Sequence, residues 1–411
     1  MTVTTSATGH AGDVLAMLIA PLTREQFFAE CFERRVHRTH GHHPAVDDLL
    51  SMDRIDELIS DSELPPNSLS MAKSGESVPP AEYTFDNGIV DRGAVLDNFR
   101  DGATIILPQL HYADGKLYQF CLALEREFGA RVQTNIYLTP PGSTGFGIHY
   151  DDHDVFVIQV AGAKQWEIYG DRDGLPYKGE SFRKDHDETG ELRDSFVLNP
   201  GECLYVPRGT AHRAPNHGTE PSLHITVGIL VQTWAEFMLE AVAEASLRIP
   251  DLRHSLPRSM FFNSSTAEGA GVADNEATFR RLIRQIAETA SFDATRAAFS
   301  GNFVRSQGTR TRGALLALAK GIAPDDRFTV REHILYSFET APVSDGDGEG
   351  EDVEHTIVLA GSSIPMSANL APQLQERIGQ GSLAMADFAV EDEEELADII
   401  GTLVAYGLLR P

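Results

Sequence analysis

The sequence predicts a mixed fold in three parts: a β-sandwich or barrel preceded by helices, a helical region, and a small terminal α/β region. Short strands separated by Gly, Pro, Asn and Asp dominate from Val132 to about Val231, which is typical of a sandwich or barrel. At Trp234 the apolar period changes from that of strands to that of amphipathic helices. The composition changes again near Arg327, and a length of 411 residues fits two or three domains.

The region before the strands is predicted to be mainly helical over residues 13–60. Thr23 and Gln26 have the spacing of a capping box at the start of "FFAECFERR". Further along, "ATIILPQL" is a candidate for a buried strand, and the helix "GKLYQFCLALEREFG" precedes the strand "RVQTNIYLTP". The strands that follow are predicted in "DVFVIQV", "KQWEIYG", "SFVLNPGECLYVPRG" and "SLHITVGILV".

Beyond Trp234 the sequence predicts two amphipathic helical segments, "TWAEFMLEAVAEASLRI" and residues 275–304, joined by a Gly/Ser-rich loop at 263–275. Two strands, "RFTVREHILYSFET" and "EHTIVLAG", then flank an acidic loop at 344–354 that is too polar to pack. Two terminal helices, "NLAPQLQERIG" and "EDEEELADIIGTLVAYGLL", complete a pattern that suggests a winged-helix module. No direct DNA binding is expected, because "VEDEEELAD" would face phosphate with carboxylates.

The composition narrows the class of partner and the compartment. A formal net charge of −27 repels nucleic acid and attracts basic proteins or peptides, although it also serves solubility alone. Cys31, Cys121 and Cys203 are widely spaced in apolar surroundings, as expected of reduced thiols in a cytoplasmic protein. No apolar run of membrane-spanning length and no secretory signal is expected from the sequence.

The stretch "GIHYDDHDVFVIQVAGAKQWEIYG" crowds ionisable groups against an apolar run. In a strand, His149 and Asp151 would project to the same side, and burying both costs free energy unless something satisfies them. A metal ion would do so, and one His with one carboxylate is two-thirds of the facial triad of iron(II) oxygenases. The third ligand is expected in "NPGECLYVPRGTAHRAPN", where His212 follows the turn at Gly209.

Neighbouring polar residues have more ordinary interpretations. His153 and Asp154 are expected to form a satisfied pair at the start of the strand. His224, one strand after His212, is expected to be a core residue or to lie behind the ligands, and Trp166 is expected to pack in the core.

These segments carry a family resemblance. "NIYLTPPGSTGFGIHYDDHDVFVIQVAGAKQWEIY" and "LNPGECLYVPRGTAHRAPN" resemble the signature segments of cupin-type JmjC oxygenases, in particular the branch that hydroxylates ribosomal proteins. The resemblance implies a double-stranded β-helix (jelly-roll) catalytic domain with N-terminal helices, a helical dimerisation domain and a C-terminal winged-helix domain. These domains would span residues 1–232, 233–320 and 321–411.

Position by position, the resemblance implies that His149, Asp151 and His212 bind Fe(II). Lys164 stands where the family places a cation for the distal carboxylate of 2-oxoglutarate, and it is one of only six lysines beside 28 arginines. The further positions that match family residues near this co-substrate are Asn135, Tyr137 and Thr226.

The implied reaction is hydroxylation by Fe(II), 2-oxoglutarate and O2 of an amino-acid side chain in a protein, such as a basic ribosomal protein, by a cytoplasmic homodimer. The same chemistry on a biosynthetic peptide or a small metabolite is the first alternative. A non-enzymatic regulator with a cupin sensor and a winged helix is the second. The third is a cupin isomerase or hydrolase with Zn or Mn, which would not need Lys164.

Overall fold

The computed structural model describes residues 3–5, 14–61, 64–171, 174–183, 186–187, 189–261, 268–342, 353–390 and 392–411. The chain divides into two compact units. One spans His10–Val231, and the other joins the strand β1 (Val3–Thr5) to Gln232–Pro411.

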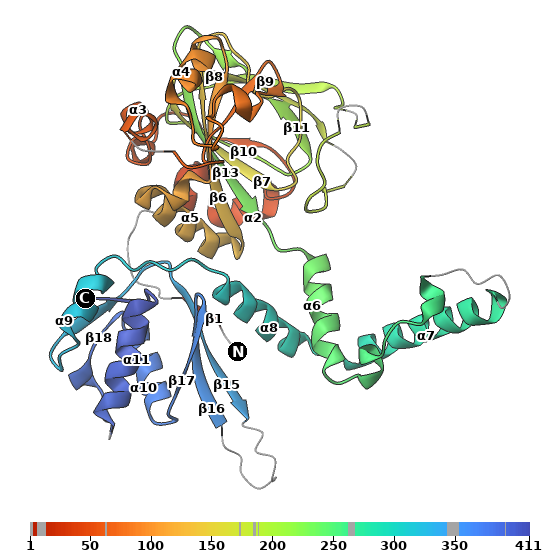
Figure 1. The fold of residues 1–411 in the computed structure, drawn as a ribbon, viewed down its shortest axis with the longest axis vertical. Coiled ribbons are helices and arrows are strands. Elements are labelled where there is room, and N and C mark those ends of the chain that lie inside the picture. Colours follow the sequence, from red (N-terminus) through yellow and green to blue (C-terminus); the bar gives the residue numbers. More distant parts are fainter. Residues whose placement is uncertain are drawn as a thin grey trace. The chain divides into compact units, whose positions relative to one another are not determined.

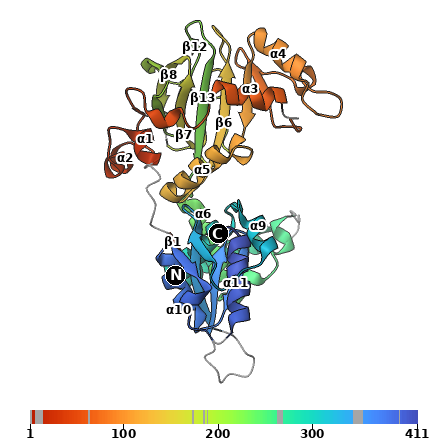
Figure 2. The ribbon, with the colours of Figure 1, turned by 90° about the vertical axis from the view of Figure 1, so that its left-hand side faces the viewer.

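The first unit is built on an antiparallel sheet of eight strands, which Figures 1 and 2 show beside the helices of the same unit. In spatial order the strands are β2 (His37–Arg38), β10 (Cys203–Val206), β7 (Asp154–Ala161), β13 (Ser222–Leu230), β6 (Arg131–Thr139), β5 (Thr104–Pro108), β3 (Ser70–Lys73) and β4 (Glu76–Ser77). The neighbours of β7 are distant in sequence, so the sheet is assembled from long-range pairs, as in Greek-key and jelly-roll folds.

A second, smaller sheet completes the barrel. Its strands are β11 (Thr210–Arg213), β8 (Ala163–Asp171), β12 (Asn216–His217) and β9 (Leu192–Leu198), with β8 pairing all the others. The two sheets pack face to face, because Val157 of β7 and Leu204 of β10 share one apolar cluster with Trp166 of β8. The hairpin between β7 and β8 turns at Gly162, where a Cβ would meet the carbonyl oxygen of Pro221 at 2.3 Å.

Helices cover the outer face of the larger sheet. They are α1 (Val14–Ile19), α2 (Arg24–Glu30) and α5 (Gly115–Phe128); α3 (Met52–Asp61) and α4 (Arg92–Arg100) also belong to this unit. Phe27 of α2 packs on Phe156 and Tyr205 with ring centroids 5.7 and 4.9 Å apart. Since β7 is covered on both faces, its residues from Asp154 to Gln159 are all buried, which explains an apolar run without alternation. The predicted capping box of Thr23 and Gln26 is confirmed at α2.

The second unit contains helices and two further sheets. Its elements are α6 (Trp234–Ser246), α7 (Glu268–Thr289), α8 (Phe292–Arg305), α9 (Ala314–Lys320), β14 (Arg327–Val330), β15 (Leu335–Pro342), β16 (Val353–Leu359), β17 (Ser362–Met366), α10 (Leu370–Gly379), β18 (Ser382–Ala384), α11 (Glu393–Ala405) and β19 (Leu409–Arg410). The sheets have the orders β1-β15-β16-β17 and β18-β14-β19.

Two predicted boundaries in this unit were wrong. The helix α7 begins at Glu268, within the predicted loop at 263–275. The predicted single strand at 327–340 is two strands, β14 and β15, which belong to different sheets. His333, between them, has a φ of +63°, which extended strand backbone does not allow. Positions 344–352 of the predicted acidic loop at 344–354 lie outside the described residues.

The three cysteines are free and buried, as predicted. Within the described part of the chain, no helix combines the length and the apolarity needed to cross a bilayer.

Candidate metal centre

His149 and His212 are brought together by the backbone. Each donates its amide N–H to the carbonyl oxygen of the other, over 3.1 and 2.8 Å, in an isolated antiparallel bridge. His212 lies in β11, which pairs with β8, while His149 lies before β7. The pairing places the two imidazole rings side by side with centroids 4.6 Å apart. Two residues that are far apart in the sequence therefore form one local unit.

Asp151 comes from the loop that follows His149. Its carbonyl oxygen accepts a hydrogen bond of 2.9 Å from the amide of Gly209, and its Oδ2 lies 3.8 Å from Nε2 of His212. One candidate ligand atom from each of His149, Asp151 and His212 lies within 4.8 Å of those of the other two. Among the described residues, this is the group of three His, Cys, Asp or Glu side chains that could hold a metal ion.

His149 and Asp151 point to a common centre, as predicted, but the predicted reason, alternation within a strand, was wrong. Residues 149–153 lie outside any strand, and β7 begins only at Asp154. The backbone bridge to His212 and the hydrogen bond from Gly209 hold the two side chains on one side.

Both imidazoles present Nε2 toward the centre. Nδ1 of His149 lies 2.9 Å from the carbonyl oxygen of Gly147, and Nδ1 of His212 lies 2.9 Å from that of Thr210. A carbonyl oxygen only accepts, so Nδ1 is the hydrogen-bond donor in each ring, and Nε2 is the nitrogen that remains for a metal ion. Such hydrogen bonds orient metal-binding histidines in proteins.

The electrostatic environment keeps His212 neutral. Burial, followed by the charge of His149, lowers the pKa of His212 to about 4. At neutral pH a proton therefore does not compete with a metal ion for its Nε2.

A narrow cavity of about 90 Å³ leads away from these three residues into the barrel. It is lined by all the residues that the sequence predicted for the co-substrate: Asn135, Tyr137, Lys164 and Thr226. Thr226 of β13 pairs with Asn135 of β6, so the two lie on adjacent strands. The Oδ1 atom of Asn135 accepts a hydrogen bond of 3.1 Å from the amide of Gln109, which leaves its NH2 group as the donor available to the cavity.

Lys164 is the buried cation of this cavity. Its side chain is 3% exposed, and burial lowers its pKa to about 7. No carboxylate or other hydrogen-bond acceptor pairs with its ammonium group in the described part of the chain. A buried, unpartnered ammonium costs free energy in the empty protein, so a ligand with a negative charge is the complement that the cavity lacks.

His224 is buried and is not one of the three candidate ligands, as expected, and it also lines this cavity, which the sequence reasoning did not predict. It is 5% exposed, its ring stacks on that of Tyr137 with centroids 4.9 Å apart, and its Nδ1 has no hydrogen-bond partner. Burial and the charge of Lys164 lower its pKa well below the ordinary value, so it is neutral. The signal was present: His224 and Thr226 are two residues apart on β13 and therefore share a face.

Two other expectations have different outcomes. Trp166 is buried in the core between the sheets, as expected, with its ring 5.6 Å from that of His212. His153 and Asp154 do not pair with each other. Nδ1 of His153 lies 2.9 Å from Oδ1 of Asp152, whereas Asp154 turns to the opposite side of the sheet and contacts Tyr205 and Arg208.

Comparison with known proteins identifies the region that contains this site. Residues 109–237 match the JmjC domain family. This segment is a JmjC domain. The match includes the three candidate metal ligands and every residue named above for the cavity.

Relatives extend the JmjC match beyond this segment. A bifunctional lysine-specific demethylase and histidyl-hydroxylase NO66 from Dictyostelium discoideum is 30% identical over 267 residues, which cover 61% of this chain and 50% of that protein. Ribosomal oxygenase 1 from Bos taurus is 28% identical over 312 residues, which cover 70% of this chain and 45% of that protein. The chain thus spans half or less of the length of these relatives.

Solved structures match nearly the whole JmjC-containing chain. The X-ray structure of E. coli ycfD has a TM-score of 0.54 at 15% identity and covers 94% of this chain and 98% of that chain. A structure of YcfD, described as a ribosomal oxygenase from Escherichia coli in complex with cobalt and succinic acid, has the same TM-score and identity, with 95% and 98% covered. At this identity the similarity shows a common fold, and the predicted cupin-like β core with associated helices is confirmed.

Proposed function

We propose that this protein is an Fe(II)- and 2-oxoglutarate-dependent oxygenase that hydroxylates an amino-acid side chain in a protein. The observation that carries the proposal is one cavity with two ends. At one end lie the ligand atoms of His149, Asp151 and His212, and deep in the barrel lies the unpartnered ammonium of Lys164. A 2-oxo dicarboxylate has the matching pair of ends, since it chelates a metal through its oxo acid and carries a second carboxylate.

The donor set fits iron(II). Two imidazoles and one carboxylate would hold the ion through three protein ligands and would leave positions open for a chelating co-substrate and O2, which is the 2-His-1-carboxylate pattern of non-haem iron oxygenases. Lys164 would bind the distal carboxylate of 2-oxoglutarate, beside Tyr137, Thr226 and the imidazole of His224. When bound, iron and 2-oxoglutarate supply the oxidising chemistry, in which O2 and the oxo acid yield succinate, CO2 and one oxygen atom for the substrate.

The protein's own residues would prepare that chemistry. Nδ1–H donation to Gly147 and Thr210 fixes both imidazoles for binding through Nε2. Trp166, Val155 and Val157 line the cavity with apolar surface, which excludes bulk water and strengthens the contact between Lys164 and a carboxylate.

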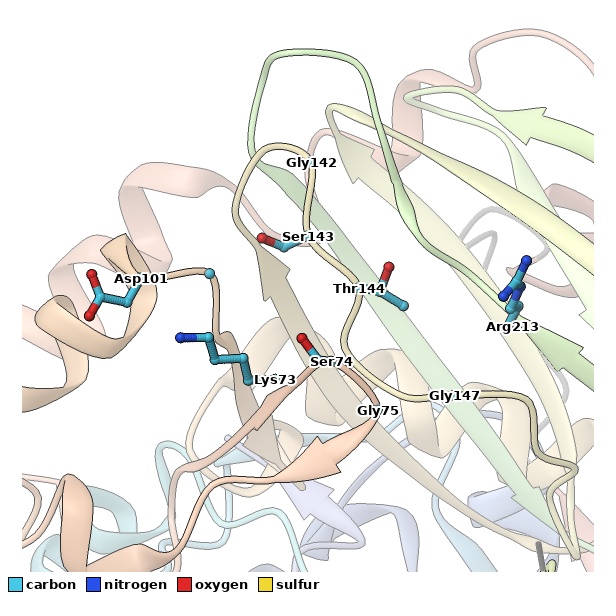
Figure 3. A pocket seen from close by; sticks show the side chains of 10 residues that line it. Lys73, Ser74, Gly75, Asp101, Gly142, Ser143, Thr144, Gly147 and Arg213 are labelled. Carbon is cyan, nitrogen blue, oxygen red and sulfur yellow. The ribbon is translucent and has the colours of Figure 1, made fainter.

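A second hollow, of about 450 Å³, provides room for the substrate around the reacting group (Figure 3). It is bordered by Gly147 and Arg213, which are close in sequence to His149 and His212, and by Lys73 to Gly75 and Gly142 to Thr144. Its walls are rich in Gly, Ser and Thr, so backbone groups are accessible for hydrogen bonds to a peptide. A charge of −27 favours a basic partner, and relatives are named ribosomal oxygenases, so we infer that a basic ribosomal protein is the substrate.

The test begins with purified protein loaded anaerobically with Fe(II). On addition of O2, 2-oxoglutarate should be converted slowly to succinate even without substrate; no conversion would favour a cupin isomerase or hydrolase instead. Intact masses of ribosomal proteins from wild-type and deletion strains should then differ by one oxygen atom in one protein. If the masses agree while succinate forms, the substrate is a biosynthetic peptide or a small metabolite.

We further propose the domain assignment 1–232 catalytic, 233–320 dimerisation and 321–411 winged helix, in a cytoplasmic homodimer, with the exception that β1 (Val3–Thr5) belongs to the second unit because it pairs with β15. Trp234, Met238 and Val242 recur at helical spacing on α6 and are 69%, 56% and 39% exposed, and Phe279 on α7 is 63% exposed. An apolar stripe of this kind is typical of a helix that packs on a second chain. Light scattering should give twice the monomer mass for wild type and the monomer mass for Met238→Glu.

Support for the winged-helix assignment comes from α10 and α11 beside the sheet β18-β14-β19. The first turn of α11 carries Glu393, Glu394 and Glu395, which would repel phosphate, so the module is proposed to bind protein and not DNA. Tight binding of duplex DNA would instead favour the non-enzymatic regulator.

A further inference from the structure

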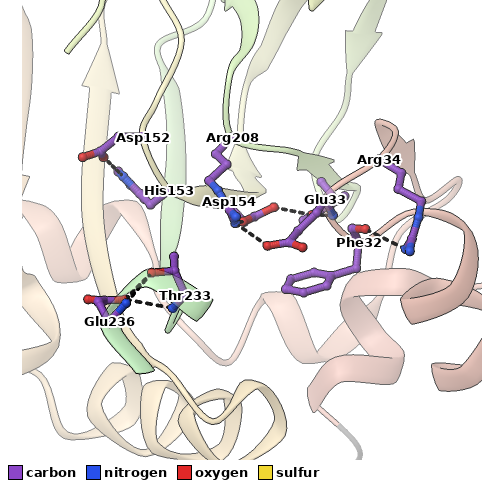
Figure 4. Close-up of polar contacts among 10 residues, drawn as sticks. Phe32, Glu33, Arg34, Asp152, His153, Asp154, Arg208, Thr233 and Glu236 are labelled. Atoms are coloured by element: carbon purple, nitrogen blue, oxygen red, sulfur yellow. Dashed lines mark hydrogen bonds and ion pairs between the residues drawn. The ribbon is translucent and has the colours of Figure 1, made fainter. Parts of the chain in front are cut away.

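A buried network of charged groups lies next to the loop at 149–153, which carries two of the candidate metal ligands, and on the helix-covered side of the larger sheet (Figure 4). Nη1 of Arg208 lies 2.8 Å from Oδ2 of Asp154 and 2.6 Å from Oε1 of Glu33. The hydroxyl of Tyr205 donates to Oδ1 of Asp154 over 2.5 Å and accepts from the backbone amide of Glu33 over 2.8 Å. Asp154 and Tyr205 are fully buried and Arg208 is 8% exposed.

The network joins the two segments that carry the candidate ligands. Asp154 is three residues after Asp151, and Arg208 is four residues before His212. Between these points the amide of Gly209, which follows Arg208, donates to the carbonyl oxygen of Asp151. The two segments are therefore fastened at the His149–His212 bridge, at Gly209 and at the Arg208–Asp154 ion pair, in that order away from the metal centre.

Glu33 ties this arrangement to the N-terminal helices. It follows α2 and has a φ of +57°, a conformation that is uncommon for a residue with a side chain. In that conformation its amide reaches Tyr205 while its carboxylate reaches Arg208. Phe27 of α2 packs on the ring of Tyr205 from the same side, which holds the phenol in place. The strained backbone is thus offset by contacts that all lead to the ligand-bearing segments.

We propose that Glu33, Tyr205, Arg208 and Asp154 are positioning residues that hold His149, Asp151 and His212 at the separation a metal ion requires before the ion binds. The proposal rests on the metal site of the proposed function and extends it to residues that touch neither metal nor co-substrate. The carboxylate of Asp154 has two partners, Tyr205 and Arg208, which fix its orientation. Because Asp154 begins β7, the loop at 149–153 is then held at a fixed position. Loss of the network would let the loop at 149–153 adopt several conformations. A metal ion would then have to order the loop when it binds, and this cost in free energy would reduce the affinity for the metal.

The matched control is a second buried carboxylate in the same unit that is also ion-paired with an arginine. Oε1 of Glu125 lies 3.2 Å from Nε of Arg131 and accepts a hydrogen bond of 3.0 Å from the amide of Val132. Glu125 is 4% exposed and lies in α5, outside the ligand-bearing segments. Glu125→Gln therefore disturbs a comparable buried carboxylate without a route to the metal loop.

The experiment measures the dissociation constant of Co(II), and its visible absorption, for the full-length wild type and the variants Asp154→Asn, Tyr205→Phe, Glu33→Gln and Glu125→Gln. We expect the first three variants to bind Co(II) about 10- to 100-fold more weakly, with a changed spectrum, while Glu125→Gln keeps the wild-type constant. Glu33 has a partly exposed carboxylate, so Glu33→Gln tests the network even if Asp154→Asn does not fold. Arg208→Lys, which keeps a cation, should recover part of the affinity lost in Arg208→Gln.

The outcomes separate the two hypotheses. If wild type binds no Co(II), the proposed metal site is wrong and the positioning role falls with it. If wild type binds Co(II) and Glu33→Gln and Tyr205→Phe bind it equally well, the metal site stands and the positioning role is overturned. If Glu125→Gln weakens binding as much as Asp154→Asn does, the network acts only through general stability and the proposal is again overturned.

Discussion

Lys164 and Arg208 are buried cations in the same unit, but their surroundings are opposite. Lys164 is 3% exposed and has no anionic partner among the described residues, and burial lowers its pKa to about 7. Arg208 is 8% exposed and lies between the carboxylates of Asp154 and Glu33. Burial alone would lower the pKa of Arg208, but these two carboxylates outweigh it and raise the pKa.

The difference between the two sites indicates how a buried charge can be interpreted. A compensated charge such as Arg208 is tolerated in the interior because each group has its partner, and removing one partner leaves the other charge buried and unpaired. An uncompensated charge such as Lys164 lowers the stability of the empty protein and is retained where a ligand supplies the missing partner. The two sites lie on opposite faces of β7, so one strand separates the structural charge network from the functional one.

The largest effect is expected from removing a ligand near Lys164 while leaving the Arg208 network intact. His212→Ala should abolish turnover, because Asp151 and His149 alone cannot hold iron with the required geometry. Succinate formation and Co(II) binding measure the loss. The substitution keeps the backbone amide and carbonyl that pair with His149, so the melting temperature should remain close to that of wild type. Near-normal turnover would refute the three-ligand site.

Stability should respond with opposite signs at the two cations. Arg208→Met leaves Asp154 buried without a cation and should cost about 3–5 kcal/mol of unfolding free energy. Lys164→Met removes an unpartnered buried charge and should stabilise the metal-free protein by roughly 2–3 kcal/mol. Denaturant unfolding of the metal-free variants measures both changes. Destabilisation by Lys164→Met would mean that its ammonium has a favourable role in the empty barrel.

Affinity for the co-substrate should change by a smaller factor. Lys164→Ala removes a charge-assisted contact worth about 2–3 kcal/mol. The concentration of 2-oxoglutarate required for half-maximal turnover (the 2-oxoglutarate requirement) should therefore rise roughly 30- to 150-fold. Steady-state succinate formation against the concentration of 2-oxoglutarate measures it. Lys116→Ala, at an exposed lysine in the same unit, is the control and should leave the requirement unchanged. An unchanged requirement in Lys164→Ala would place the carboxylate elsewhere.

Sequence patterns predicted the β core because it depends on local signals, whereas the family resemblance assigned Asn135, Tyr137, Lys164 and Thr226 to the cavity. The alternation of strands placed Asn135 with Tyr137, and the turn before Lys164 brought it into the second strand of a hairpin. The positions predicted for the metal also proved to be neighbours, although a backbone bridge and not a strand aligns them.

The Arg208 network could not be predicted from the sequence. It joins Glu33, Asp154 and Arg208, which are far apart along the chain, and their pairing follows only from the order of strands in the sheet. The left-handed backbone of Glu33 carries no residue signal, since glycine is absent there. The predicted pairing of His153 with Asp154 was also wrong, because His153 lies in the loop before β7 and contacts Asp152, whereas Asp154 is the first residue of β7 and contacts Tyr205 and Arg208.

The smallest predicted effect is a pH dependence of binding that Lys164 should show and a permanent cation should not. Below pH about 7 the ammonium is already protonated, so the affinity for 2-oxoglutarate does not depend on this group. Above that pH the free protein loses the proton, and binding of the dicarboxylate must take one up. The dissociation constant should then rise by up to about tenfold per pH unit, until the pH reaches the higher pKa that Lys164 has beside a carboxylate.

Titration of the Co(II)-loaded protein with 2-oxoglutarate, from about one unit below to two units above this pKa, measures the slope. In Lys164→Arg the guanidinium remains charged throughout, so the slope due to this position should vanish. A wild-type affinity that stays constant across the range would show that the ammonium keeps its proton in the free protein, and that a partner for Lys164 exists within the barrel. Lys164 would then resemble Arg208, and the contrast between the two buried cations would not hold.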